Sequence, residues 1–203
     1  MYPTVSTRFR AATRFKKQAD VREQILTAAT LIASEQGWQE LSMRKIARHI
    51  RLSATMIYEY FTGKDDLLDA IVQIGFRRLL AVMNSARLTA KSPPDQLAAI
   101  WRAYVRFAVE DATAYRLMFG IRTGHLPGKP ALTGIASVCA MVGEVTSKIN
   151  QQKLLPGEVT EGKSHALWAA AHGIATLRLT GGTLPEHSYQ DILTDALTII
   201  VSN

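Results

Sequence analysis

The chain has 203 residues, of which 47% are hydrophobic, and a formal net charge of +7 at pH 7. The apolar share is enough for a sizeable core, and the single cysteine, Cys139, excludes an intramolecular disulfide. With neither a secretory leader nor a run of about 18 apolar residues, the sequence favours a cytoplasmic protein. The apolar neighbours of Cys139 predict a buried thiol rather than a nucleophile or a ligand.

The positive charge is concentrated near the N-terminus. Residues 1–64 hold 11 Lys or Arg against 5 Asp or Glu, whereas residues 65–203 hold 13 against 12. A basic segment on a nearly neutral body is typical of a module that binds nucleic acid or an anionic membrane surface. Residues 1–18 are interpreted as a flexible basic arm, with a solubilising tail or a transit peptide as the alternatives.

Three helices are predicted in the N-terminal part. Apolar residues recur at helical spacing over 19–36, and Gly37 follows as a C-terminal cap. Ser42 and Ser53 then stand as N-caps before short helices that end near residues 50 and 61. A turn of about three or four residues joins these two helices, which outlines a helix-turn-helix.

The rest of the chain predicts further helices and no strand. They are expected over 64–87, 96–110, 113–119, 132–152, 162–180 and 188–201, separated by the double proline of KSPPD, the loop 120–130 and the Pro-Gly break at 156–157. We therefore predict an all-α fold of about nine helices. No phosphate-binding loop, paired metal ligands or catalytic serine motif is recognised, so no enzyme, cofactor or metal is expected.

The third predicted helix carries tyrosines on its outer side. Ile57 and Phe61, four residues apart, define its buried side. Tyr58 and Tyr60 then project sideways or outward, where their hydroxyls can reach phosphate oxygens. The alternative is that both tyrosines are half-buried packing residues with hydrated hydroxyls.

Base and phosphate contacts can be assigned around these tyrosines. Ala54 and Thr55 open the helix, and the N-terminal residues of a recognition helix meet base edges. Lys64 opens the next helix, whose free N–H groups favour an anion, although a solvated lysine is the plainer alternative. Arg44 and Lys45 lie on the outer face of the preceding helix.

The segment LSMRKIARHIRLSATMIYEYFTGKDDLL, residues 41–68, resembles the helix-turn-helix of the TetR family of transcriptional repressors. That family usually has glycine in the turn, where this chain has Arg51. A left-handed backbone there would cost a non-glycine residue roughly 1 to 2 kcal/mol, so either the turn is slightly altered or a phosphate contact by Arg51 offsets the strain. The resemblance implies that Ser42, Tyr58, Tyr60 and Lys64 contact phosphates, while Arg44, Ala54 and Thr55 face bases. The full predicted DNA-binding set is Ser42, Arg44, Lys45, Arg51, Ser53, Ala54, Thr55, Tyr58, Tyr60 and Lys64.

Two later segments, 104–120 and 167–182, resemble the regulatory domain called WHG after Trp, His and Gly, here Trp168, His172 and Gly173. The resemblance implies inducer binding, and dimerisation through the helices at 162–180 and 188–201, with packing within the chain as the alternative. Trp168 and His172 share a helix face and could line a cavity, although aromatic stripes are more often plain core. The predicted ligand-binding residues are Trp101, Tyr104, Met118, Phe119, Trp168 and His172.

Together these patterns predict a homodimeric regulator, a repressor released from a palindromic DNA operator by a small-molecule inducer. Its parts are expected at 1–18, the arm; at 19–65, the DNA-binding domain; and at 66–203, the ligand-binding and dimerisation domain. Two rival interpretations remain, an enzyme that uses histidines such as His165 and His172, and a membrane-surface protein that uses the arm.

Overall fold

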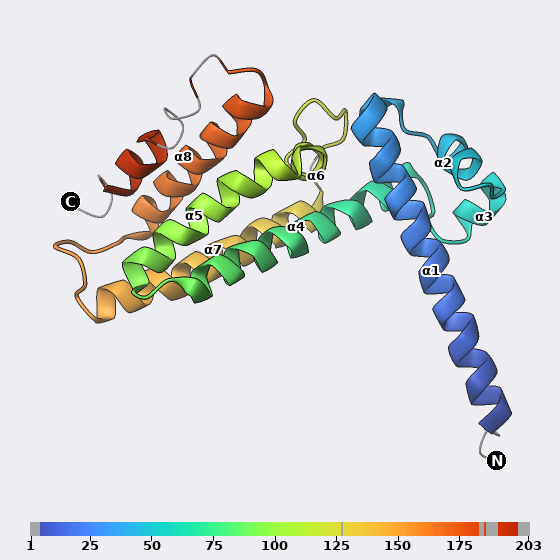
Figure 1. Ribbon diagram of the computed structural model, residues 1–203, viewed down its shortest axis with the longest axis horizontal. Helices are drawn as coiled ribbons and strands as arrows, with labels where there is room; N and C mark the ends of the chain where they lie inside the picture. The colour runs from blue at the N-terminus through green and yellow to red at the C-terminus, as the bar shows by residue number, and fades with distance from the viewer. Residues whose placement is uncertain (1–4, 127, 183–184, 186–190, 199–203) are drawn as a thin grey trace. The chain divides into compact units, whose positions relative to one another are not determined.

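The computed structural model describes residues 5–126, 128–182, 185 and 191–198, with side chains from residue 18 onward (Figure 1). The elements follow in the order α1, η1, α2 to α8, where η1 is a 3-10 helix, and residues 191–198 form a further helical segment. No strand occurs among these described residues, and the all-α prediction is confirmed.

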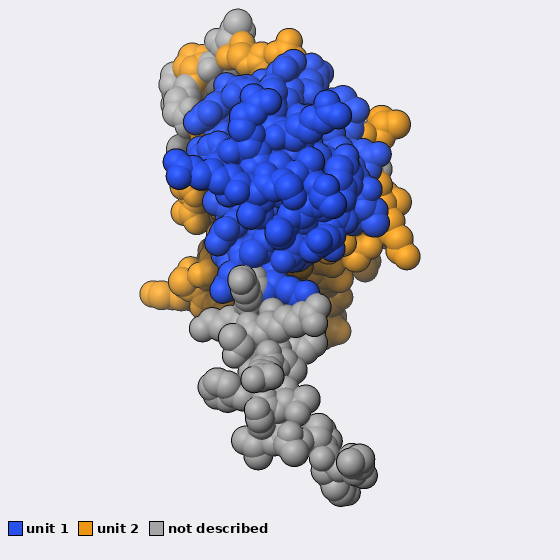
Figure 2. Space-filling view, turned by 90° about the vertical axis from the view of Figure 1, so that its right-hand side faces the viewer, with its two compact units in different colours: residues 1–71, 123–125 blue, residues 72–122, 126–203 orange. Residues whose placement is uncertain are grey.

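The chain divides into two compact units, which Figure 2 colours separately. Unit 1 comprises residues 1–71 and 123–125, and unit 2 comprises residues 72–122 and 126–203. The division falls inside α4 (Lys64–Thr89), between Ile71 and Val72, whereas the sequence suggested a boundary after residue 65. The first turns of α4 belong to unit 1 because they carry buried leucines, Leu67 and Leu68.

Unit 1 consists of α1 (Val5–Gln36), η1 (Trp38–Glu40), α2 (Met43–His49), α3 (Ala54–Tyr58) and the start of α4. Within it, α1 contacts η1 and α2, and α2 contacts α3. Its core contains the apolar side chains that recur at helical spacing, among them Ile25, Ala29, Ile46, Ile57 and Phe61.

The first helix extends into the segment that the sequence assigned to a flexible arm. Helix α1 begins at Val5, so residues 5–18 continue the helix that the sequence placed only at 19–36. The physical reason is the absence of any helix breaker. Between Pro3 and Gly37 the chain has no proline or glycine, and Ala, Arg, Lys and Gln, which favour helix, are frequent there.

Unit 2 is arranged around α5 (Pro93–Glu110), which contacts α6 (Ala112–Met118), α7 (Lys129–Gln151) and α8 (Glu161–Leu179) (Figure 1). The prolines of α5 and α7 occupy the first helical positions, where a missing N–H costs nothing, so both helices start three residues earlier than predicted. Of the predicted segment 188–201, residues 191–198 are helical and the remainder lies outside the described residues.

Helices α4 and α7 approach closely at a glycine. A Cβ atom added to Gly134 of α7 would collide with the ring of Phe76 on α4. The hydrogen at this position therefore lets the aromatic ring lie directly against the α7 backbone, and both residues are buried.

Among the described helices, only α7 is long and apolar enough to cross a membrane, judged by length and composition alone. Its contacts with α5 and α8, and its buried stripe through Val138, Val142 and Val145, are those of a core helix in a helical domain.

Candidate functional site

The two helices of the predicted helix-turn-helix pack through a small apolar core. Ile46 and Ala47 of α2 and Ile57 of α3 are buried, and Phe61, just after α3, is 1% exposed. Each helix starts with a serine cap: the Ser42 hydroxyl accepts from the Lys45 N–H at 3.2 Å, and the Ser53 hydroxyl accepts from the Met56 N–H at 3.1 Å. The caps and the shared core fix the orientation of α3 relative to α2.

The turn between these helices contains Arg51 in a left-handed conformation, with φ 57°. The Leu52 N–H donates to the Ala47 carbonyl at 2.9 Å, and the Arg51 N–H donates to the Arg48 carbonyl at 3.3 Å. This pair of bonds is the Schellman motif, whose left-handed position is usually glycine. The expected backbone is thus present, and Arg51 adopts it at a cost of roughly 1 to 2 kcal/mol.

The N-terminal end of α3 faces solvent. Thr55 is exposed and Ala54 is half-buried, so the side of α3 opposite Ile57 offers a methyl group and a hydroxyl to a partner. Arg44 of α2 and the Arg51 side chain are also exposed. DNA could therefore reach the start of α3, to which base contact was assigned, and the basic side chains around it at the same time.

The aromatic residues of MIYEYF divide by burial. Phe61 is in the core, whereas Tyr58 is 54% exposed and Tyr60 is half-buried. Neither tyrosine hydroxyl forms a hydrogen bond with any residue that the structure describes. Both hydroxyls can therefore bind an external oxygen without breaking an internal bond.

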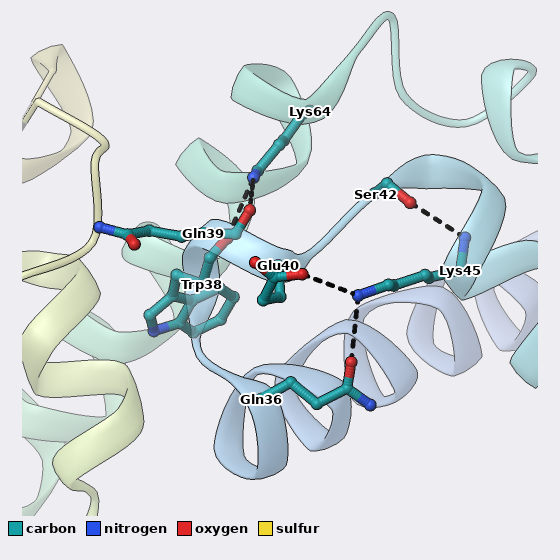
Figure 3. Close-up of polar contacts among 7 residues, drawn as sticks. All are labelled: Gln36, Trp38, Gln39, Glu40, Ser42, Lys45 and Lys64. Atoms are coloured by element: carbon teal, nitrogen blue, oxygen red, sulfur yellow. Dashed lines mark hydrogen bonds and ion pairs between the residues drawn. The ribbon is translucent and has the colours of Figure 1, made fainter.

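Two lysines of the predicted DNA-binding set are held by internal partners (Figure 3). The Lys64 ammonium donates to the Trp38 carbonyl at 3.0 Å and to the Gln39 carbonyl at 3.4 Å, which ties the start of α4 to η1. The Lys45 ammonium bonds Gln36 at 3.1 Å and the Glu40 carboxylate at 3.3 Å. An ammonium has three N–H donors, so each lysine retains one for a further acceptor.

In unit 2, four of the ligand-binding candidates belong to one aromatic cluster: Tyr104, Phe119, Trp168 and His172. Tyr104 and Met118 are fully buried, and the Phe119 ring lies 4.7 Å from the His172 ring between centroids. The Tyr104 and Tyr115 hydroxyls are 2.9 Å apart, and His172 Nδ1 lies 3.1 Å from the first and 2.7 Å from the second. The Trp168 indole donates to the Tyr104 hydroxyl at 3.4 Å.

Burial controls protonation in this network. It raises the pKa of Tyr104 to about 12, raises the pKa of Tyr115 further, and lowers the pKa of His172. The tyrosines are therefore neutral at pH 7, and His172 favours its neutral form. The polar atoms of this cluster bond one another inside unit 2, and the role of these residues in ligand binding stays a prediction.

A cavity of about 340 Å³ lies beside this cluster, between α5, α7 and the first turns of α8. Of the predicted ligand-binding residues it contains Trp101 and Trp168. The remaining walls were not predicted and include Val138, Cys139, Val142, Val159, Glu161 and His165. Cys139 is partly exposed to this space, so the prediction of a buried thiol is wrong.

Two family models match the chain, one over each part of this geometry. The model described as "Bacterial regulatory proteins, tetR family" matches residues 25–71, which include the helix-turn-helix. The model described as "Tetracyclin repressor-like, C-terminal domain" matches residues 97–199, more than half of the chain.

The chain belongs to the TetR family. An uncharacterized HTH-type transcriptional regulator of Haemophilus influenzae is 29% identical over 96 residues, 47% of this chain and 51% of that protein. The HTH-type transcriptional activator FasR of Mycolicibacterium smegmatis is 29% identical over 98 residues, 48% of this chain and 45% of that protein. These matches span about half the length of each relative.

A solved structure of a Rhodococcus sp. RHA1 protein of unknown function shares the fold. It has a TM-score of 0.74 at 24% identity, over 88% of this chain and 92% of that chain. TetR-family membership identifies a transcription factor and not an enzyme, as the sequence predicted. The WHG type of the C-terminal domain stays a prediction.

This TetR-family chain also has a loop contact that the sequence did not predict. Residues 123–125, between α6 and α7, belong to unit 1 together with the helix-turn-helix. Thr123 is 3% exposed, and the His125 ring lies 3.5 Å from the Asp69 carboxylate and 3.8 Å from that of Asp65. No local pattern in the loop 120–130 indicates this packing, because its partners lie about 60 residues earlier in the chain.

Proposed function

We propose that this protein is a homodimeric, ligand-responsive regulator that binds a palindromic DNA operator and represses transcription until a small-molecule inducer binds. The observation that carries the proposal is the solvent-facing side of α3. There, Thr55 and Tyr58 lie on a capped helix of a helix-turn-helix, and Tyr60 follows two residues after it; the two tyrosine hydroxyls have no partner within the described chain.

Base recognition is assigned to the start of α3. Thr55 offers a hydroxyl and a methyl group, and Ala54 is small enough for close approach to a thymine methyl. Arg44 is exposed on α2 and carries a guanidinium that can bind a guanine edge with two hydrogen bonds. These three residues would give sequence preference.

Phosphate contacts are assigned to the residues around them. Tyr58 and Tyr60 would donate their hydroxyl hydrogens, and Ser42 can donate its own while its oxygen caps α2. Lys64 and Lys45 would each use the one N–H donor that their internal partners leave over. Both lysines also bond to other parts of unit 1. They would therefore position the DNA-binding surface and add positive charge to it.

Dimerisation is assigned to α8 and the segment that follows it. A Cβ atom added to Gly173 would have no atom of another helix within 4 Å, and Leu177 is 46% exposed. A small residue and an exposed leucine one turn apart on α8 suit the close approach of a helix from a second copy. A dimer would present two α3 helices to the two halves of a palindrome.

Ligand response is assigned to unit 2 and its cavity. A ligand changes DNA affinity only by the difference between its affinities for the bound and the released state. Helix α4 runs continuously from Lys64 in unit 1 into unit 2, so a ligand-dependent shift of α4 would reach the DNA-binding side. Repression is proposed because the matched C-terminal model is named for the tetracycline repressor. Activation is the alternative role, since the relative FasR is named an activator.

The experiment is fluorescence anisotropy with a mixed-sequence 30-bp duplex and the full-length protein at several salt concentrations. With about 6 to 10 phosphate contacts per dimer, affinity should fall by roughly 10³ to 10⁵ between 50 and 200 mM salt. Tyr58→Phe should weaken binding, whereas Tyr115→Phe, a buried tyrosine of unit 2, serves as the matched control. The absence of DNA binding at 50 mM salt would refute the proposal.

A further inference from the structure

The cavity of unit 2 has a distinct chemical character. Two indole rings, Trp101 and Trp168, and three valines line its wall. A volume of about 340 Å³ is at the small end of small-molecule sites, which span about 300 to 1,000 Å³. Flat apolar molecules of one or two fused rings suit such a wall.

Three polar side chains of the cavity, Asn150, Thr146 and Ser164, are already satisfied by the protein. Asn150 bonds both backbone groups of Val159, with its amide donating at 3.1 Å and its carbonyl accepting at 2.8 Å. The Thr146 hydroxyl donates to the Gly143 carbonyl at 3.2 Å, and the Ser164 hydroxyl donates to the Thr160 carbonyl at 3.2 Å. None of these groups requires a ligand.

Trp101 differs from these three residues because its polar atom is buried without a partner. Its side chain is 1% exposed, and its indole N–H has no acceptor among the residues that the structure describes. An unpaired donor buried in this way is costly, and a ligand that supplies an acceptor recovers that cost. The buried part of the cavity therefore calls for one acceptor atom, such as a carbonyl oxygen.

The charge of the lining decides between neutral and anionic ligands. No Lys or Arg among the described residues lines the cavity, whereas the Glu161 carboxylate does. A carboxylate ligand would lose its hydration against tryptophan and valine, meet no lysine or arginine, and approach the like charge of Glu161. An uncharged acceptor meets none of these penalties.

We infer that the cavity binds a compact aromatic molecule that carries an uncharged hydrogen-bond acceptor and no negative charge, with the acceptor bound by the indole N–H of Trp101. This inference rests on the proposed function, since it names the chemical class of the inducer. Glu161, exposed at the N-terminus of α8, acts against anionic analogues of the same shape.

The test is calorimetric titration of the full-length protein with matched pairs of probes: benzamide and benzoate, 2-naphthamide and 2-naphthoate, indole-3-carboxamide and indole-3-carboxylate. At least one amide should bind, and its acid should bind at least about tenfold more weakly. Trp101→Phe keeps an aromatic ring but removes the donor, and it should weaken the amide about tenfold. Glu161→Gln should recover part of the acid binding, whereas Glu158→Gln, an exposed residue outside the cavity lining, should not.

The inference is overturned if no amide binds, if an acid binds as tightly as its amide, or if Trp101→Phe binds the amide like the unchanged protein. Because Trp101 is a core residue, circular dichroism must show that this variant is folded; if it is not, the Glu161→Gln comparison decides. Anisotropy with duplex DNA is measured on the same preparations. Intact DNA binding without the amide preference refutes the inference alone, whereas lost DNA binding refutes the proposed function.

Discussion

Replacing Arg51 by glycine should stabilise the protein and weaken its DNA binding at the same time. Arg51 has φ 57° in the Schellman motif that ends α2, a backbone that costs an L-residue roughly 1 to 2 kcal/mol and glycine nothing. Glycine also makes the unfolded chain more flexible, which lowers the free energy of unfolding by up to about 1 kcal/mol. The net gain should be about 0.5 to 1 kcal/mol, or roughly 1 to 4 °C in Tm for a chain of this length.

Arg51→Ala separates the two effects, because it keeps the strain and removes only the guanidinium. Its Tm should stay close to that of the unchanged protein, and both variants should lose the same DNA affinity and about one unit of salt slope. Lys153 is the matched control: it has φ 49° in the same motif at the end of α7, with the Leu154 N–H donating to the Ile149 carbonyl at 3.1 Å. Lys153→Gly should raise Tm without changing DNA affinity.

Thermal unfolding followed by circular dichroism, together with anisotropy, measures both quantities. The reasoning about strain fails if Arg51→Gly is no more stable than Arg51→Ala. The assignment of Arg51 to a phosphate fails if both variants bind DNA with the affinity and salt dependence of the unchanged protein.

Three further outcomes are expected. Gly134→Ala should lower the free energy of unfolding by about 1 to 3 kcal/mol, because the added Cβ would collide with Phe76. Gly143→Ala on the same helix has no atom within 4 Å of the added Cβ and should be neutral or stabilising. Urea unfolding measures both variants, and equal effects would contradict the packing of Gly134 against Phe76. Burial lowers the pKa of His172, so below about pH 6.5 the unfolded chain binds a proton more readily than the folded chain. The free energy of unfolding therefore falls on acidification, by at most about 1.4 kcal/mol per pH unit. His172→Gln should flatten that part of the Tm-against-pH profile, and an unchanged profile would argue against a neutral buried imidazole. Thr55→Ala should change the preferred base sequence, whereas Lys64→Ala should weaken binding to all DNA sequences alike. Lys64→Ala should also lower Tm, because it removes the bonds to η1. An equal loss of affinity for every sequence from both variants would contradict their separate roles.

The helices of unit 1 could be predicted closely because their signals are local. Ser42 and Ser53 cap the helices that they were expected to cap, and Ile57 and Phe61 are buried as their spacing indicated. The left-handed position at Arg51 was also accessible to prediction, since the family resemblance marked it as a usual glycine. Such features depend on residues only a few positions apart.

Contacts between distant segments could not be predicted in the same way. A shared helix face suggested that Trp168 and His172 line one cavity, but Trp168 borders it while His172 bonds to two buried tyrosines. The α7 wall of the cavity came from a helix whose apolar residues gave no indication of which would remain accessible. The internal partners of Lys64 lie about 25 residues earlier, in a 3-10 helix that the sequence did not predict.

Selection of bound sequences from random double-stranded DNA by the full-length protein tests the central claim most directly. The proposed dimer should recover an inverted repeat, with half-sites whose centres lie about one helical turn of DNA apart or somewhat more. The same selection with Thr55→Ala should change bases within each half-site and keep the spacing. Recovery of no enriched sequence, or of a single unrepeated site, would contradict a dimeric operator-binding regulator.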